Sequence, residues 1–215
     1  MSKKYAYYGS AGKTFQDKKV KEKFGAKSTR AGSRGERLLF KKLRGPKKDR
    51  SLGWLPADVP LFCSLKVPGK ASDIDFAICR GDTILLIDAK MYGQSGGIYW
   101  SKGNDPHIYH NAGKYIATNG DEVKMSKSMI MAKDILSRSH TVKKHGLKVE
   151  AAVFFVSDTS KKNTKLPFVW FLRFPGGIKT YNERGAYFFL KRFLLFKRRT
   201  DQTKVAEEYL RSLCQ

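Results

Sequence analysis

Two apolar runs separated by a short polar turn form the most regular pattern in the chain. The first run follows Asp73, the second ends at Asp88-Ala89-Lys90, and Arg80-Gly81-Asp82 lies between them. Apolar runs bounded by turn residues predict β-strands, and a connection this short predicts an antiparallel hairpin. Antiparallel pairing brings the start of the first strand close to the end of the second. We therefore expect the acidic residues at these two ends to lie together.

Segments on both sides of the hairpin show helical or strand patterns. The predicted elements are a helix over about 33–43, a strand over 59–67, the hairpin over 73–90, a helix over about 124–139, strands over 149–156 and 168–174, and helices over about 185–199 and 205–213. The helix between the third and fourth strands allows a parallel crossover. This order predicts an α/β domain with a mixed sheet.

Composition divides the chain into three parts. Residues 1–30 are rich in Lys, Gly, Ser and Thr and have no apolar period, which predicts a basic flexible arm. Such an arm could bind nucleic acid or be no more than a solvated tail, and both interpretations stay open. The α/β domain is expected over 31–175, and basic, aromatic C-terminal helices over 176–215 are expected to pack on it.

The first predicted helix carries a carboxylate on its apolar side. At helical spacing Glu36 shares one face with Leu39 and Leu43. A carboxylate among apolar side chains is costly unless it is paired or binds a metal ion. Gly35 would let this part of the helix approach another backbone closely. The alternative is that Glu36 is a first-turn residue stabilised by the helix dipole.

The charge balance points to a polyanionic partner. The 215 residues suffice for one domain with a sizeable core. Lys and Arg number 43 against 19 Asp and Glu, a net charge of +24, while 41% hydrophobic and 13% aromatic content argue against a wholly disordered chain. A folded protein of this charge is expected to bind nucleic acid, and an anionic membrane surface is the alternative partner.

Cysteine usage and hydropathy predict a cytoplasmic protein. Cys63, Cys79 and Cys214 have neither metal-binding spacing nor an even number for a disulfide framework. The N-terminus lacks the apolar core of a signal peptide, and no run reaches the roughly 20 apolar residues of a membrane span. No obligatory protein partner is evident.

The acidic hairpin ends have the residue types of a metal-dependent phosphodiesterase. Hard divalent cations are held by carboxylate oxygens, so Asp75 and Asp88 are candidate ligands for Mg²⁺ or Mn²⁺. The backbone carbonyl of Ala89 could add a third oxygen. Lys90, on the same strand face as Asp88, could position a water or stabilise the transition state. Glu36 could supply a further carboxylate if its helix packs beside the strand ends.

This arrangement resembles the PD-(D/E)XK nuclease superfamily, in which one strand carries an Asp and the next carries (Asp/Glu)-x-Lys. The matching residues are Asp75 and Asp88-Ala89-Lys90, in a helix, three strands, helix, strand order. More closely, the chain resembles the nuclease-related domain (NERD) family, over about 30–156. That resemblance is carried by GSRGE at 32–36, DIDF at 73–76, IDAKMYG at 87–93 and GIY at 97–99.

The resemblance implies a restriction-endonuclease-like core and hydrolysis of DNA, with RNA possible, using Mg²⁺ or Mn²⁺. It implies catalytic roles for Glu36, Asp75, Asp88 and Lys90. The family usually has Glu where Asp88 stands, and its Asn-Pro and Gln signature has no clear counterpart here. The residues expected to contact phosphates without reading sequence are Lys41, Lys42, Lys127, Lys197, Arg198 and Arg199.

Other interpretations remain open at this point. Asp88 and Lys90 could form a surface ion pair that contributes little. The chain could be a non-catalytic nucleic-acid-binding protein on a nuclease-like scaffold, or a membrane-surface protein that binds through its aromatic C-terminal helices. His107 and His110 suggest an HNH-type nuclease, but no ββα pattern surrounds them, so this interpretation ranks below the carboxylate site.

Overall fold

The computed structural model describes residues 6–10, 26–45, 53–70, 72–91, 98–102, 105–110, 113–114, 127–156, 168–170 and 173–214. Its elements in chain order are β1 (Tyr7–Tyr8), α2 (Ala26–Arg44), β2 (Leu61–Lys66), β3 (Asp73–Arg80), β4 (Thr83–Lys90), β5 (Ile98–Trp100), β6 (Tyr109–His110), β7 (Gly113–Lys114), α3 (Lys127–Arg138), α4 (His140–Lys144), β8 (Lys148–Phe155), β9 (Phe168–Trp170), β10 (Arg173–Phe174), the 3₁₀ helix η3 (Pro175–Gly177), β11 (Ile178–Tyr181), α5 (Glu183–Phe196) and α6 (Asp201–Leu213).

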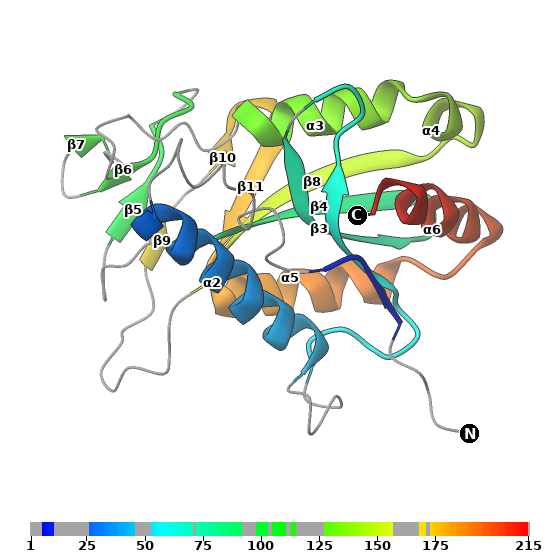
Figure 1. The fold of residues 1–215 in the computed structure, drawn as a ribbon, viewed down its shortest axis with the longest axis horizontal. Helices are drawn as coiled ribbons and strands as arrows, with labels where there is room; N and C mark the ends of the chain where they lie inside the picture. The colour runs from blue at the N-terminus through cyan, green and yellow to red at the C-terminus, as the bar shows by residue number, and fades with distance from the viewer. Residues whose placement is uncertain are drawn as a thin grey trace.

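The fold is a mixed α/β arrangement around one large sheet (Figure 1). The strand order is β1-β2-β3-β4-β8-β11-β10. Strands β2, β3 and β4 pair antiparallel, whereas β8 lies parallel to β4 and follows it through α3, as the predicted crossover requires. A smaller sheet has the order β7-β6-β5-β9. The α/β class and the mixed sheet are therefore confirmed.

The predicted hairpin is present, with Gly81 and Asp82 at its turn. Arg80 pairs with Thr83, so only these two residues connect β3 to β4. Gly81 has a φ of 59°, a conformation that residues with a Cβ rarely adopt and that hairpin turns of this length require. The hairpin places Asp82 at one end of the large sheet and Asp88 toward the other.

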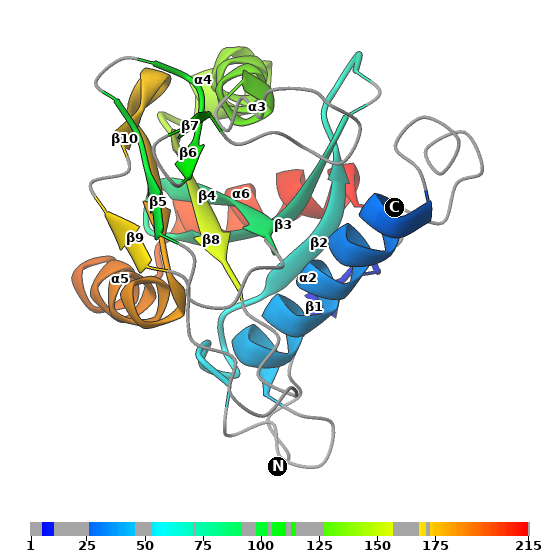
Figure 2. The ribbon, with the colours of Figure 1, turned by 90° about the vertical axis from the view of Figure 1, so that its left-hand side faces the viewer.

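Helices cover both faces of the large sheet (Figure 2). One apolar core contains Leu39 and Leu43 of α2 with Ala186, Leu190 and Phe193 of α5. The other contains Met129, Ala132 and Leu136 of α3 with Ala206 and Leu210 of α6. The C-terminal helices are thus packed on the α/β core, one on each face. No described helix has the length and apolar character needed to cross a membrane.

Local signals set the boundaries of the C-terminal helices. The Asn182 side chain accepts a hydrogen bond from the Gly185 amide at 2.9 Å and caps α5. Thr200 and Thr203 form reciprocal side-chain to backbone hydrogen bonds, which cap α6. These caps fix the start of α5 at Glu183 and of α6 at Asp201, whereas the predicted starts were about 185 and 205.

Other predicted boundaries also differ from the structure. Helix α2 begins at Ala26, so it includes residues assigned to the basic arm, and only part of 1–30 is described. The apolar run 168–174 was predicted as one strand, but β9 pairs with β5 in the small sheet and β10 pairs with β11 in the large one. An apolar run indicates a strand without identifying the strand that it pairs with.

A buried arginine fastens the end of α2 to its surroundings. Arg44 has 0% of its surface exposed. Its Nη2 donates hydrogen bonds of 2.6 Å to the carbonyls of Ala6 and Val59, and its Nη1 donates one of 3.4 Å to the carbonyl of Pro56. Hydrogen bonds from a charged donor are stronger than neutral ones, so Arg44 joins three otherwise separate chain segments.

The substitution Arg44→Met should lower the free energy of unfolding by about 2–4 kcal/mol, because three carbonyls lose hydrogen bonds from a buried, charged donor. Lys41→Met, at an exposed position of the same helix, is the matched control and should change it by less than about 0.5 kcal/mol. Urea unfolding of both variants provides the measurement. Equal stability of Arg44→Met and the parent would contradict this role.

Candidate acidic active site

Helix α2 carries Glu36 to the ends of the central strands. A Cβ on Gly35 would lie 3.0 Å from the Cβ of Met91 and 3.7 Å from Cγ2 of Val156, the residues that directly follow β4 and β8. Only glycine allows this approach without displacing a neighbour. Glu36 lies next in sequence and is 1% exposed. Because α2 begins at Ala26, the first-turn interpretation of Glu36 is wrong.

The β3–β4 ladder ends just before the acidic residues. Its last pair at this end is Phe76 with Ile87. Beyond it, the amide of Ala89 donates a hydrogen bond of 2.7 Å to Oδ2 of Asp75. The carboxylate thus accepts the hydrogen bond that a backbone carbonyl of β3 would accept in a continued ladder. This contact holds the Asp75 side chain beside β4.

Strands β2 and β3 change face where Asp75 lies. Cys63 and Phe76 belong to the core under α2 and α5, but Leu65 and Ile74, each two residues away, belong to the opposite core. A regular strand keeps residues two apart on one face. Ser64, opposite Asp75, has a φ of 50°, which is uncommon for a residue with a Cβ. The pattern of apolar residues in the sequence does not predict this change of face in β2 and β3.

Asp88 and Lys90 form an ion pair at the end of β4. The Lys90 Nζ lies 2.9 Å from each of the two carboxylate oxygens of Asp88. Asp88 is 8% exposed, whereas Lys90 is half-buried. The predicted shared face of these two residues is confirmed. Partial burial makes this contact stronger than a solvent-exposed ion pair.

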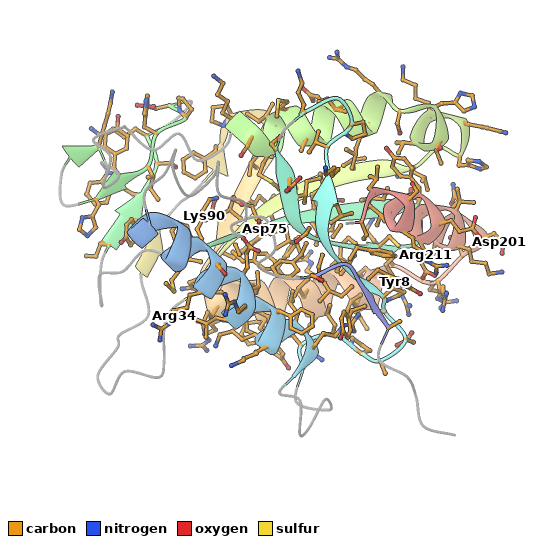
Figure 3. All side chains as sticks on the ribbon, in the orientation of Figure 1. Tyr8, Arg34, Asp75, Lys90, Asp201 and Arg211 are labelled. Carbon is orange, nitrogen blue, oxygen red and sulfur yellow. The ribbon has the colours of Figure 1, made fainter. Side chains whose placement is uncertain are left out.

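Electrostatics place all four predicted residues in one cluster. The pKa of Asp75 is raised well above its usual value, first by burial and then by the nearby carboxylates of Asp88 and Glu36. The ammonium of Lys90 and the hydrogen bond from the Ala89 amide oppose this rise. Asp75 and Lys90 lie close together behind α2, whereas the labelled Arg34 lies on the far side of that helix (Figure 3). Among the described residues, the charged side chains that act on Asp75 are therefore two carboxylates and the Lys90 ammonium.

The donor atoms suit a small divalent cation. The Lys90 carbonyl accepts from the Val156 amide on the β8 side, so the preceding Ala89 carbonyl points the other way, toward Asp75. Carboxylate and carbonyl oxygens are the donors that Mg²⁺ and Mn²⁺ prefer. Within the described ranges, no three His, Cys, Asp or Glu residues are arranged to hold a metal ion. In this arrangement Asp88 is instead neutralised by Lys90.

Part of the small sheet lies next to this cluster. Tyr99 of β5, within the GIY segment of the sequence, is fully buried, and its ring stacks on Phe155 at 5.6 Å between centroids. Phe155 is the β8 residue paired with Lys90. The His110 ring lies tilted against the ring of the same Tyr99, with 4.9 Å between centroids, and His107 binds Asp105, so both histidines have structural partners.

The predicted phosphate-binding residues are not gathered at the acidic cluster. Lys42 pairs with Glu183 at 2.7 Å, and Arg199 pairs with Glu207 at 2.9 Å. Lys197 donates to Thr83 Oγ1 at 2.6 Å, at the turn end of the hairpin. Thr83 precedes Asp88 by five residues, about 16 Å along a strand. The remaining three, Lys41, Lys127 and Arg198, are exposed on α2, on α3 and after α5.

The raised pKa of Asp75 predicts a specific pH dependence of stability. Between the pKa of the unfolded chain, about 3.9, and the higher folded value, the folded state holds the proton more tightly. The free energy of unfolding therefore falls as pH rises through this interval. Asp75→Asn keeps an acceptor for the Ala89 amide but has no ionisable group at this position. The free energy of unfolding of this variant, relative to that of the parent, should therefore increase as pH rises.

Urea unfolding at several pH values between about 4 and 8 provides this measurement. Asp201→Asn is the control, because the hydrogen bond from Lys204 lowers the pKa of that exposed carboxyl and any pH-dependent difference takes the opposite sign. A constant difference between Asp75→Asn and the parent would contradict the electrostatic description of the cluster.

Comparison with known proteins adds no family assignment. No protein-family model matches the chain, and searches of curated proteins and of solved structures find no match.

Proposed function

We propose that the chain is a nuclease that depends on a divalent cation and hydrolyses phosphodiester bonds of DNA. The observation that carries this proposal is the cluster at the strand ends. Asp75, Asp88 and Glu36 come from two strands and a helix, and burial together with the charges of Asp88 and Glu36 raises the pKa of Asp75. Carboxylates that are buried close together destabilise the folded state, and clusters with perturbed pKa values are typical of functional sites.

The order of the elements supports a restriction-endonuclease-like core of the PD-(D/E)XK type. Helix α2, strands β2 to β4, helix α3 and strand β8 follow one another as that core requires. On this proposal Asp75 and the Asp88-Ala89-Lys90 segment occupy the positions of the superfamily motif. The NERD resemblance belongs to the same proposal, since it rests on sequence segments that contain these residues.

The residues would divide the chemistry among them. Asp75, Asp88 and the Ala89 carbonyl would hold Mg²⁺ or Mn²⁺, whose charge would offset the charge that develops on the phosphate. Lys90 would orient the attacking water or stabilise the charged transition state with its ammonium. Glu36, nearly fully buried, would act on Asp75 through its negative charge and keep the cluster selective for cations.

The net charge supports nucleic acid as the substrate. With a charge of +24 at pH 7, the molecule attracts polyanions at long range, and this attraction weakens as salt is added. The acidic cluster is an exception within that charge distribution. A cation bound there would let a phosphate approach the carboxylates.

The second candidate is a nucleic-acid-binding protein that does not cut. It is favoured by the ion pair between Asp88 and Lys90, which neutralises one carboxylate without a metal ion. It is also favoured by the arrangement of the described residues, which offers no ready three-residue metal group. Cleavage and metal binding separate the two candidates.

Asp88→Asn and Lys90→Met should each reduce cleavage of a DNA substrate at least about 100-fold, because each removes charge that acts on the transition state. Product formation on plasmid and labelled oligonucleotides, with Mg²⁺ or Mn²⁺ present, gives the rate. RNA oligonucleotides in parallel would show whether DNA is preferred.

The matched controls are Asp73→Asn and Lys66→Met. These residues carry the same two charges and pair across β2 and β3 near the same end of the sheet. They should leave the rate within about twofold of the parent, as expected for residues outside the cluster. Cleavage by Asp88→Asn at the parental rate, or undiminished cleavage in EDTA, would contradict the proposed site.

Metal binding should be visible without catalysis. Saturating Mg²⁺ or Mn²⁺ should raise the thermal unfolding midpoint of the parent, because a ligand at about 100 times its dissociation constant stabilises by about 2.7 kcal/mol. The shift should vanish in Asp75→Asn and Asp88→Asn and persist in Asp73→Asn. An unshifted parent would instead support the non-catalytic candidate.

A further inference from the structure

Helix α5 exposes an unusual amount of apolar surface. Six large hydrophobic residues in the described part of the chain are exposed, and four of them lie on this helix. Phe188 is 58% exposed, Leu195 76% and Phe196 73%. Apolar surface of this kind, gathered on one element, is typical of a binding surface.

A pocket of about 670 Å³ lies between α5 and the neighbouring strands β8 and β11. This volume is within the range of roughly 300–1,000 Å³ that small-ligand sites occupy. Aromatic rings form much of its lining. The rings of Tyr181 and Phe189 stack with 4.6 Å between centroids, and Phe193 and Phe196 continue the aromatic surface along α5.

Cations alternate with these rings. The Arg192 guanidinium lies 5.6 Å from the centroid of Phe196, and the Lys197 ammonium lies 5.6 Å from that of Phe193. Lys179, exposed on β11, lines the same pocket. Glu150 is the acidic residue among those lining it. The pocket therefore offers flat rings and positive charge to an anionic ligand.

We propose that this pocket receives an unpaired base of a single-stranded nucleic acid, while Lys179, Arg192 and Lys197 contact the adjoining phosphates. Base stacking on aromatic side chains beside a cationic groove is the general mode of single-strand binding without sequence preference. A concave pocket that is lined by aromatic rings and that includes the carboxylate of Glu150 suits a flat base better than the broad surface of an anionic bilayer.

The pocket is separate from the acidic cluster. Glu150 pairs with Leu85, three residues before Asp88 on β4. Leu85 belongs to the core under α5, whereas Leu86, two residues before Asp88, belongs to the opposite core. Binding in the pocket goes beyond the proposed nuclease activity and does not depend on whether the cluster cleaves.

Fluorescence anisotropy measures the binding of labelled oligonucleotides, and EDTA prevents any cleavage that depends on a divalent cation. The measurement therefore tests the pocket independently of nuclease activity. The probes are a labelled oligo(dT) of roughly 12 nucleotides, a length within single-strand site sizes, and the same backbone with abasic sites. The parent should bind oligo(dT) at least about fivefold more tightly than the abasic strand. Phe196→Leu, which keeps an apolar side chain and removes the ring, should abolish most of that difference.

Arg192→Gln should weaken the binding of both probes and lower the salt dependence of binding, since it removes a phosphate contact. The controls Leu195→Ala and Lys191→Gln change exposed residues of α5 that do not line the pocket, and both should retain the preference for oligo(dT). The four substituted residues, Lys191, Arg192, Leu195 and Phe196, are all exposed, so each variant should keep the thermal unfolding midpoint of the parent.

Two results would overturn the proposal. One is equal affinity of the parent for oligo(dT) and the abasic strand. The other is a Phe196→Leu variant that keeps the full preference for bases. Co-sedimentation with vesicles of phosphatidylcholine and phosphatidylglycerol, together with no preference for bases, would assign the surface to lipid instead.

Discussion

The hydrogen bond between the Ala89 amide and the Asp75 carboxylate holds the strand ends in the arrangement on which the site depends. It takes the place of a ladder hydrogen bond where β3 and β4 separate. The separation lets a side chain, rather than a backbone carbonyl, lie between the strands. The same contact brings Asp75 near Asp88 and into the field of Glu36, which explains why burial and like charge both raise its pKa.

Close packing of α2 completes this arrangement. Gly35 brings the helix to the residues that follow β4 and β8, and Glu36 is thereby buried at the strand ends. Arg44 fastens the C-terminal end of the same helix through three backbone carbonyls. A helix fixed at its middle and at its C-terminal end can hold a buried carboxylate against the repulsion of its neighbours.

Periodicity in the sequence was enough to predict the hairpin, the crossover helix and the shared face of Asp88 and Lys90. These features depend on local patterns of apolar residues and on turn chemistry. The face change at Ser64 and Asp75 could not be predicted, because it comes from pairing between strands rather than from either strand alone. Residues of the α5 pocket such as Lys179 and Glu150 were missed for a similar reason, since they approach α5 only after β8 and β11 pair.

The central claim is that Asp75 and Asp88 share a divalent cation. A crystal structure of the protein grown with Mn²⁺ and recorded near the manganese absorption edge tests it most directly. A shared cation would give one anomalous peak at about 2.2 Å from a carboxylate oxygen of each residue, with Lys90 displaced from Asp88. An anomalous map with no peak there, and with the Lys90–Asp88 ion pair intact, would contradict it.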